Sequence, residues 1–165
     1  MSSRRQPFTV AIVERTEATV VTDVVTLAGV IDEAADLRPL SALGRRPIEI
    51  DLRGVQRINS SGVRTWIDFV RAVPREVPLR FVRCPPAIID QCNMVNGFLG
   101  HGRLESFYAP LACRECDEQV EQLYTTAEVR AGRGKLPPTP CPRCRRPMAI
   151  DDLEDQYLSF VREAT

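Results

Sequence analysis

Two short cysteine motifs constrain this chain more than any other feature. Cys113-x-x-Cys116 and Cys141-x-x-Cys144 have the same internal spacing, are separated by 24 residues, and contain four of the six cysteines. Two such pairs can bring four thiolates around one Zn²⁺, with each pair forming a tight knuckle. The sequence therefore predicts one zinc ion held by these four cysteines.

The segment between the two pairs is a predicted loop. Residues 131–140 are rich in glycine and proline, which suit a loop and would interrupt a helix. With this loop, the motifs resemble those of a zinc ribbon, although the usual glycine after the second cysteine is absent from the second pair. We therefore assign residues 111–165 to a zinc-ribbon-like module. Four cysteine ligands leave no open position for a catalytic water, so the zinc is expected to be structural.

Dithiol redox chemistry is the competing interpretation of these motifs. A Cys-x-x-Cys near an α/β pattern can be a thioredoxin-type site with a lowered thiol pKa. Such a site needs one pair, at the start of a helix that directly follows a strand of the sheet. The two matched pairs lie after the sheet-forming part of this chain. The pattern therefore favours metal binding.

The first 110 residues alternate between strand and helix patterns. Strands are expected over residues 8–13, 20–30, 47–52 and 77–82, with a last short strand over 106–108. Helices are expected after Asp32 as an N-cap, from Ser60 or Ser61, and from Pro85 and Pro86. This order predicts an α/β fold in which helices pack against a mixed sheet.

Four stretches of this region resemble the landmarks of a known family. They are Leu27–Asp32, Ile48–Leu52, Val55–Val63 and Asn96–Leu99, in that order along the chain. Their order and spacing resemble those of the STAS domain, the fold of sulfate transporters and anti-sigma factor antagonists, across about residues 8–110. We therefore assign residues 1–110 to a STAS-like domain.

The resemblance implies a phosphorylation site and a partner. In that family, a hydroxyl residue directly after an Asp, at the N-terminus of the second helix, is phosphorylated by partner serine kinases. Ser60 is at the matching position, and Asn59 replaces the Asp. Ser61 and Gly62 would shape the turn, and Asp32 would lie on the same surface. The implied function is that of a non-enzymatic bacterial signalling protein that binds an anti-sigma-type serine kinase.

Three alternatives stay open. In the first, Ser60 only caps the helix and is not phosphorylated. In the second, the domain is a constant adaptor subunit of a larger assembly, as STAS domains of some membrane transport systems are, and the uncharged Asn59 favours this. In the third, the ribbon binds nucleic acid through arginines such as Arg143, but the acidic stretch at residues 151–155 argues against phosphate binding.

Composition excludes further classes of protein. The 22 basic and 22 acidic residues cancel, which excludes a strongly basic nucleic-acid coat. No apolar run approaches the roughly 20 residues that cross a bilayer, and no signal-peptide pattern is present, so we expect a cytoplasmic protein. His101 is expected to be solvated in a loop, and Cys84 and Cys92 to be packing residues. We find no pattern of a catalytic site and expect no enzyme.

Two apolar patterns remain in the C-terminal third. Val120, Leu123 and Tyr124 have helical spacing, and a second helical face follows near the C-terminus. The residues of this second face are Leu153, Tyr157, Phe160 and Val161. We expect it to cover the protein's own core, and the alternative is that it docks a partner.

Overall fold

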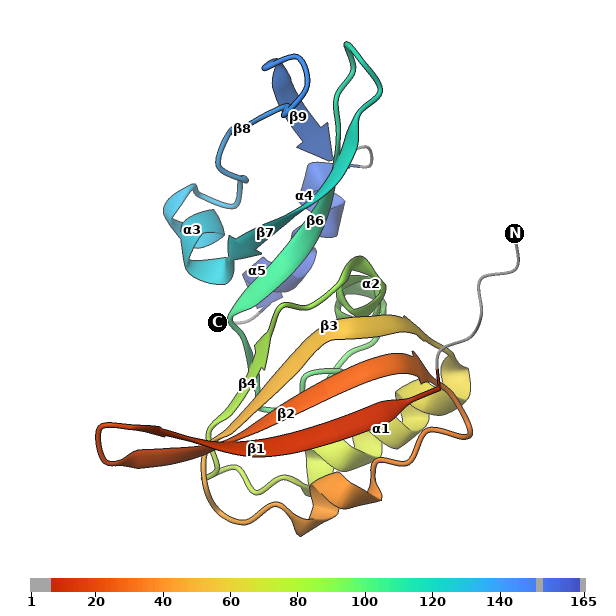
Figure 1. Cartoon of the computed structure of the whole chain (residues 1–165), viewed down its shortest axis with the longest axis vertical. Coiled ribbons are helices and arrows are strands. Elements are labelled where there is room, and N and C mark those ends of the chain that lie inside the picture. The colour runs from red at the N-terminus through yellow and green to blue at the C-terminus, as the bar shows by residue number, and fades with distance from the viewer. Residues whose placement is uncertain (1–6, 151–152, 164–165) are drawn as a thin grey trace.

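The computed structural model describes residues 7–150 and 153–163, which form two sheets and the helices packed on them (Figure 1). The strands are β1 (Thr9–Glu17), β2 (Val20–Ile31), β3 (Ile48–Ile58), β4 (Leu79–Val82), β5 (Arg103–Leu104), β6 (Ser106–Ala112), β7 (Gln119–Thr125), β8 (Thr139–Pro140) and β9 (Pro147–Ile150). The helices are the 3₁₀ helix η1 (Arg38–Ala42) and α1 (Ser60–Ala72), α2 (Pro86–Met94), α3 (Thr126–Ala131), α4 (Glu154–Tyr157) and α5 (Ser159–Glu163).

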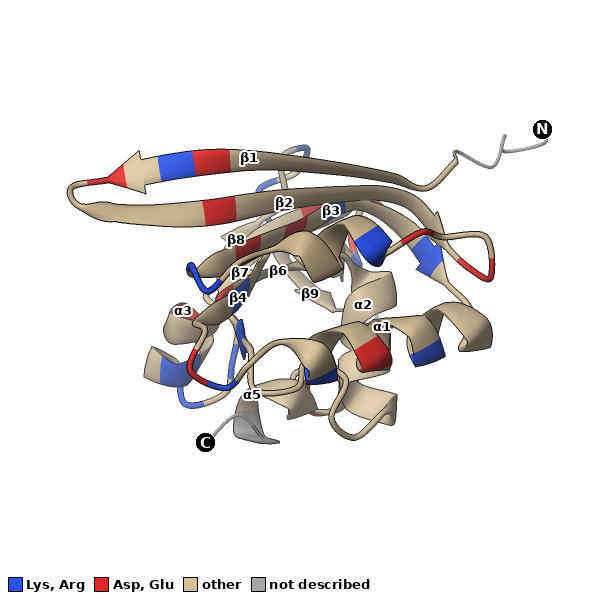
Figure 2. Cartoon of the chain, turned by 90° about the horizontal axis from the view of Figure 1, so that it is seen from below, with Lys and Arg blue, Asp and Glu red and all other residues tan. Residues whose placement is uncertain are grey.

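The first sheet has the order β1-β2-β3-β4-β5 and is mixed. β1 and β2 are an antiparallel hairpin, while β2, β3, β4 and β5 run parallel to one another. α1 and α2 lie on one side of this sheet, so its other face over β1 to β3 carries no helix among the described residues (Figures 1 and 2). The predicted mixed sheet with helices packed against it is confirmed.

The core lies between this sheet and α1. Alternate residues of β2, β3 and β4 point inward and are buried, as the two-residue period of a strand requires. Trp66 of α1 is fully buried, stacks on Phe98 at 5.6 Å between ring centroids, and donates its indole N–H to the Phe98 carbonyl at 2.9 Å. The apolar residues of α1 therefore face the core, and the one polar atom of the indole ring is hydrogen-bonded.

The helix predicted after Asp32 is wrong. The Asp32 carboxylate accepts a hydrogen bond from the Ala34 N–H at 3.0 Å, which makes a turn, and only η1 follows. Pro39 explains the difference, because it has no N–H to donate within an α-helix and it disfavours α-helical geometry at the residue before it. Leu37 and Leu40 are buried nevertheless, so the segment packs on the core without being an α-helix.

The second sheet has the order β7-β6-β9-β8. The predicted short strand at 106–108 extends to Ala112 as β6 and belongs to this second sheet, so the predicted domain boundary near Pro110 falls inside β6. The helix predicted from Val120 to Tyr124 is wrong, since these residues lie in β7. Pairing along β6, from Phe107 with Tyr124 to Ala112 with Gln119, decides the conformation there. Three apolar residues are too few to define a helical period.

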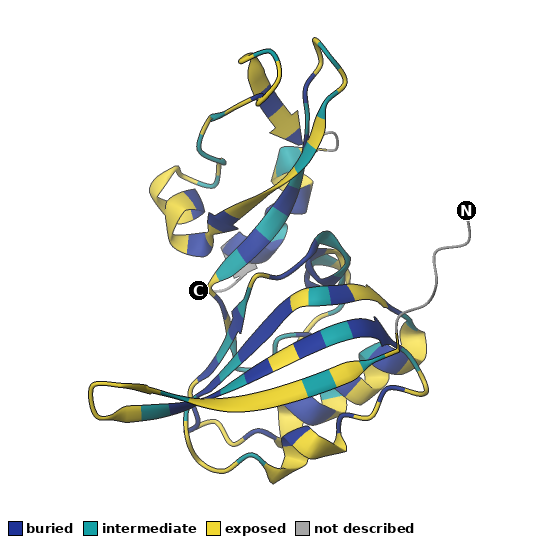
Figure 3. Ribbon diagram, in the orientation of Figure 1, coloured by how far each residue is buried: buried dark blue, intermediate teal, exposed yellow. Residues whose placement is uncertain are grey.

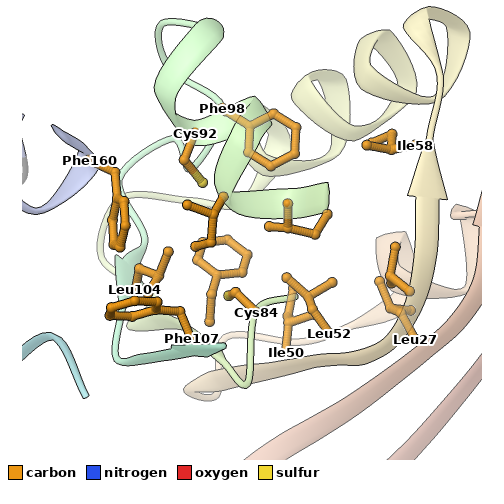
Figure 4. Packing of buried hydrophobic residues seen from close by; sticks show 14 of the residues in the cluster. Leu27, Ile50, Leu52, Ile58, Cys84, Cys92, Phe98, Leu104, Phe107 and Phe160 are labelled. Carbon is orange, nitrogen blue, oxygen red and sulfur yellow. The ribbon is translucent and has the colours of Figure 1, made fainter. Parts of the chain in front are cut away.

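The C-terminal helices α4 and α5 fold back between α2 and the second sheet. Phe160 packs edge-on against Phe107 with ring centroids 5.1 Å apart (Figure 4). The Tyr157 hydroxyl donates to the Tyr108 carbonyl at 2.6 Å. The Asn93 side chain of α2 accepts from the Phe160 N–H at 3.0 Å. The C-terminal apolar face therefore covers the protein's own core, except that Leu153 is 72% exposed.

Two free cysteines and one histidine outside the motifs have structural roles. Cys84 and Cys92 are buried beside this junction, and burial raises the pKa of both thiols, so they are packing residues as predicted. His101 is half-buried, and its Nε2 lies 2.9 Å from the Val77 carbonyl oxygen. It lies in a turn, as expected for a loop residue, but the expectation that its ring is solvated is wrong.

Gly62 is required where α1 passes the end of β2. A Cβ at this position would lie 2.1 Å from the Ile31 carbonyl oxygen, which also accepts the Asn59 N–H at 3.1 Å. We predict that Gly62→Ala lowers the free energy of unfolding by about 1–3 kcal/mol, because α1 must shift. Urea denaturation measures this. Gly44→Ala is the control, since a Cβ there meets no atom within 4 Å. Equal midpoints for the two variants would contradict the prediction.

Candidate metal centre

Each cysteine pair lies in the turn of an antiparallel hairpin. The first pair joins β6 to β7, directly after the pairing of Ala112 with Gln119. The second pair joins β8 to β9, directly after the pairing of Pro140 with Pro147. β9 also pairs with β6, so one sheet carries both turns and brings them together.

The four predicted ligands form one cluster. Cys113 Sγ lies 3.4 Å from Cys144 Sγ, and Cys116 Sγ lies 3.6 Å from both Cys141 Sγ and Cys144 Sγ. All four sulfur atoms lie within 4.8 Å of one another, and none is in a disulfide. Sulfur atoms bound at about 2.3 Å to one tetrahedral metal would be about 3.8 Å apart. The cluster therefore has the size of a four-thiolate metal site.

The two knuckles have the same backbone hydrogen bonds. The residue after the second cysteine donates its N–H to the carbonyl of the first cysteine, at 2.9 Å from Asp117 to Cys113 and 3.0 Å from Arg145 to Cys141. The carbonyl of the residue that follows accepts the N–H of the first cysteine. The distance is 2.9 Å from Cys113 to Glu118 and 2.7 Å from Cys141 to Arg146. Equal spacing in the sequence therefore produces equal turns.

A positive φ at the fifth residue closes each turn. Asp117 has φ 56° and Arg145 has φ 66°, both in the left-handed region that favours glycine. The glycine usual at this position in a zinc ribbon is absent, but its conformation is present. The backbone therefore tolerates a strained residue in each knuckle, which the sequence alone did not reveal.

The electrostatics of the cluster call for a cation. Burial opposes ionisation of Cys141, but hydrogen bonds with the backbone of Cys144 and Arg143 and with the thiols of Cys116 and Cys144 together outweigh burial and lower the pKa of Cys141 to about 7. At Cys116, a hydrogen bond with the Glu118 backbone lowers the pKa, but burial and the neighbouring thiols raise it to about 12. Four thiolates therefore share this space only when a metal ion neutralises them.

The cluster offers a closed coordination sphere. Cys113 and Cys141 are buried, and Cys116 and Cys144 are half-buried. With a cysteine at each tetrahedral position, no position is left for water or substrate. A metal here would hold two hairpins together.

Of the other predicted site residues, 59–62 lie at the start of α1, away from the knuckles (Figure 1), and Asp32 follows the end of β2. Asn59 is the N-cap, because its Oδ1 accepts the Gly62 N–H at 2.9 Å. The alternative in which Ser60 caps the helix is therefore wrong, and Ser60 and Ser61 are exposed in the first turn. Asp32 comes directly after Ile31, whose carbonyl accepts the Asn59 N–H.

Sequence analysis missed one contact of this turn. Asn59 Nδ2 donates to Glu33 Oε2 at 2.9 Å, across 26 positions of the chain. The bond joins the turn after β2 to the N-cap of α1 and sets a carboxylate beside the start of the helix. No local pattern indicates such a pairing, because it depends on how the sheet and helix pack.

Comparison with known proteins found no match for this chain, either among models of protein families or among curated proteins. Within the residues that the structure describes, no helix is both long and apolar enough to cross a membrane.

Loss of a ligand should abolish metal binding. We predict one divalent metal ion per purified chain and none in the Cys116→Ser/Cys144→Ser variant, because two thiolates do not complete the site. Metal analysis by mass spectrometry measures this, and the metal should also dissociate as acid protonates the thiolates. Cys92→Ala is the control and keeps its metal, since Cys92 lies in α2 outside the cluster. Full metal content in the double variant would contradict the assignment.

The positive φ of Arg145 gives a second test. We predict that Arg145→Gly raises the free energy of unfolding of the metal-bound protein by about 1 kcal/mol, because glycine adopts this conformation without steric cost. Arg146→Gly is the matched control, since this neighbour does not have a positive φ, and it should not stabilise the protein. Thermal unfolding with excess metal compares the two, and equal effects would disprove the role of the knuckle backbone.

Proposed function

We propose that this chain is a non-enzymatic bacterial signalling protein that acts by binding another protein, with Ser60 as its phosphoacceptor. The observation that carries the proposal is the position of Ser60. It is exposed in the first turn of the 13-residue helix α1, and Asn59 makes the capping hydrogen bond, so the Ser60 hydroxyl is not used to cap the helix.

The physical chemistry of this position suits a phosphorylation switch. A phosphate on Ser60 would lie at the positive end of the α1 dipole, next to backbone N–H groups of the first turn. Its charge of roughly −1.5 to −2 would change the surface that a partner meets. The turn itself is held in place by Gly62 and by the hydrogen bond from Asn59 to the Ile31 carbonyl. A modification here would therefore act on binding and leave the fold in place.

The sequence resemblance and the topology support the same assignment. The landmarks of the STAS domain are in register over residues 8–110, and a hairpin followed by parallel strands with helices on one side is compatible with that fold. On this basis the partner is an anti-sigma-type serine kinase, which the unphosphorylated form of this protein captures in the cytoplasm of a bacterium.

We further propose that the metal is one structural Zn²⁺ and that residues 111–165 are a zinc ribbon. Zn²⁺ is the usual ion of tetrahedral sites with four cysteines. The two matched knuckles support the ribbon. The ion would stabilise the second sheet and take no part in a reaction, which agrees with a binding function.

A constant adaptor is the second candidate, and one contact favours it. The Glu33 carboxylate is hydrogen-bonded to Asn59, next to Ser60, and it would repel a phosphate. In this version the same surface is always available to a subunit of a larger assembly, and no kinase is involved.

Intact mass spectrometry of the protein isolated from its own cells separates the two candidates. We expect a fraction with one phosphoryl group, lost in Ser60→Ala and kept in Ser61→Ala, because both serines are exposed in the same turn and only Ser60 has the matching position. Ser60→Asp should bind the partner kinase much more weakly than Ser60→Ala. Absence of phosphate under all growth conditions, with equal binding by both variants, would leave the constant adaptor.

A further inference from the structure

β1 is an exposed edge of the first sheet. Along all nine residues, from Thr9 opposite Ala28 to Glu17 opposite Val20, it pairs with β2. Within the described part of the chain no strand pairs with its other side, and seven of its nine residues are exposed (Figure 3). Its backbone therefore presents unpaired N–H and C=O groups that a further strand can bind.

This edge lacks most of the features that keep edge strands from pairing. Native edges are usually blocked by proline, by bulges or by charges. β1 contains no proline, and its register with β2 is unbroken. Its charges lie near the hairpin turn, so Thr9–Val13 is uncharged (Figure 2). Ile12 and Val13 are nevertheless 39% and 60% exposed. The unpaired backbone and the exposed apolar side chains of β1 therefore favour pairing with a further strand.

We propose that β1 pairs antiparallel with β1 of a second copy of this chain, with a two-fold axis at Val13. The pair joins two five-stranded sheets into one continuous sheet. This inference goes beyond the proposed signalling function and does not depend on phosphorylation or on the metal.

The residues of β1 select this register. Centring the pair on Val13 is the symmetric arrangement that uses all nine residues. It sets Thr9 opposite Glu17, Val10 opposite Thr16, Ala11 opposite Arg15, and Ile12 opposite Glu14. No like charges face each other directly in this register. Each charged side chain has an uncharged neighbour across the pair.

Other symmetric registers are poorer. Centring on Glu14 or Arg15 would place identical charges directly opposite, which destabilises a strand pair. Centring on Ala11 or Ile12 would pair only residues 9–13 or 9–15 within the strand. In the register centred on Val13, the two Val13 side chains meet on the same face of the sheet, since opposed residues of antiparallel strands point the same way. The most exposed large apolar side chain of β1 is thereby covered.

Sedimentation analysis of the full metal-bound chain tests the proposal. We expect a concentration-dependent dimer for the unaltered chain and a monomer for Val13→Lys and for Val13→Glu, because two like charges about 5 Å apart would face each other at the axis. An equimolar mixture of Val13→Lys and Val13→Glu should form the dimer again, since opposite charges then meet.

Val20→Lys is the matched control. Val20 is 51% exposed on β2, outside the proposed pairing, so this variant should dimerise like the unaltered chain. Circular dichroism and melting temperature establish that each variant is folded. A monomeric unaltered chain at every concentration, or a Val13→Lys variant that still dimerises, would overturn the proposal.

Discussion

The packing of Phe107 holds the two sheets of this protein together. This fully buried ring of β6 meets Phe160 at 5.1 Å, Tyr124 at 6.2 Å and Tyr157 at 6.4 Å, and its backbone bridges to Cys84 beyond β4. Aromatic pairs at these distances favour tilted or edge-on arrangements, which fix orientation as well as separation. Because α4 and α5 bring two of these rings, the C-terminal helices belong to the core of the whole molecule.

β6 connects this junction to the metal centre. The strand begins at Ser106, whose hydroxyl accepts the Arg83 N–H at 2.9 Å, and ends one residue before Cys113. Beside it, Arg53 of β3 lies 4.0 Å from the centre of the Tyr108 ring and pairs with Glu121 of β7 at 2.8 Å. The knuckles are thus held on a strand that is itself anchored to the α/β core.

The sequence predicted those features that depend on spacing. Four cysteines in two equal pairs predicted one cluster, and alternating strand and helix patterns predicted the mixed sheet. Features that depend on tertiary packing were missed. Where an α-helix was expected after Asp32, Pro39 disfavours it and the 3₁₀ helix η1 forms. Residues 119–125 form a strand because they pair with β6. Asn59 caps α1 because its side-chain carbonyl oxygen accepts the Gly62 N–H. Asn and Ser are both common N-cap residues, so cap preference does not distinguish Asn59 from Ser60.

The position of residues 157–161 affects how the chain acquires its structure during synthesis. Phe160 and Tyr157 close the core next to α2 and Phe107, although about 50 residues separate them from β6 in the chain. A nascent chain that has completed the first sheet still exposes this apolar junction until α4 and α5 have emerged. A partly synthesised chain that lacks this segment would leave apolar surface of α2 and β6 uncovered, which is the kind of surface that chaperones bind.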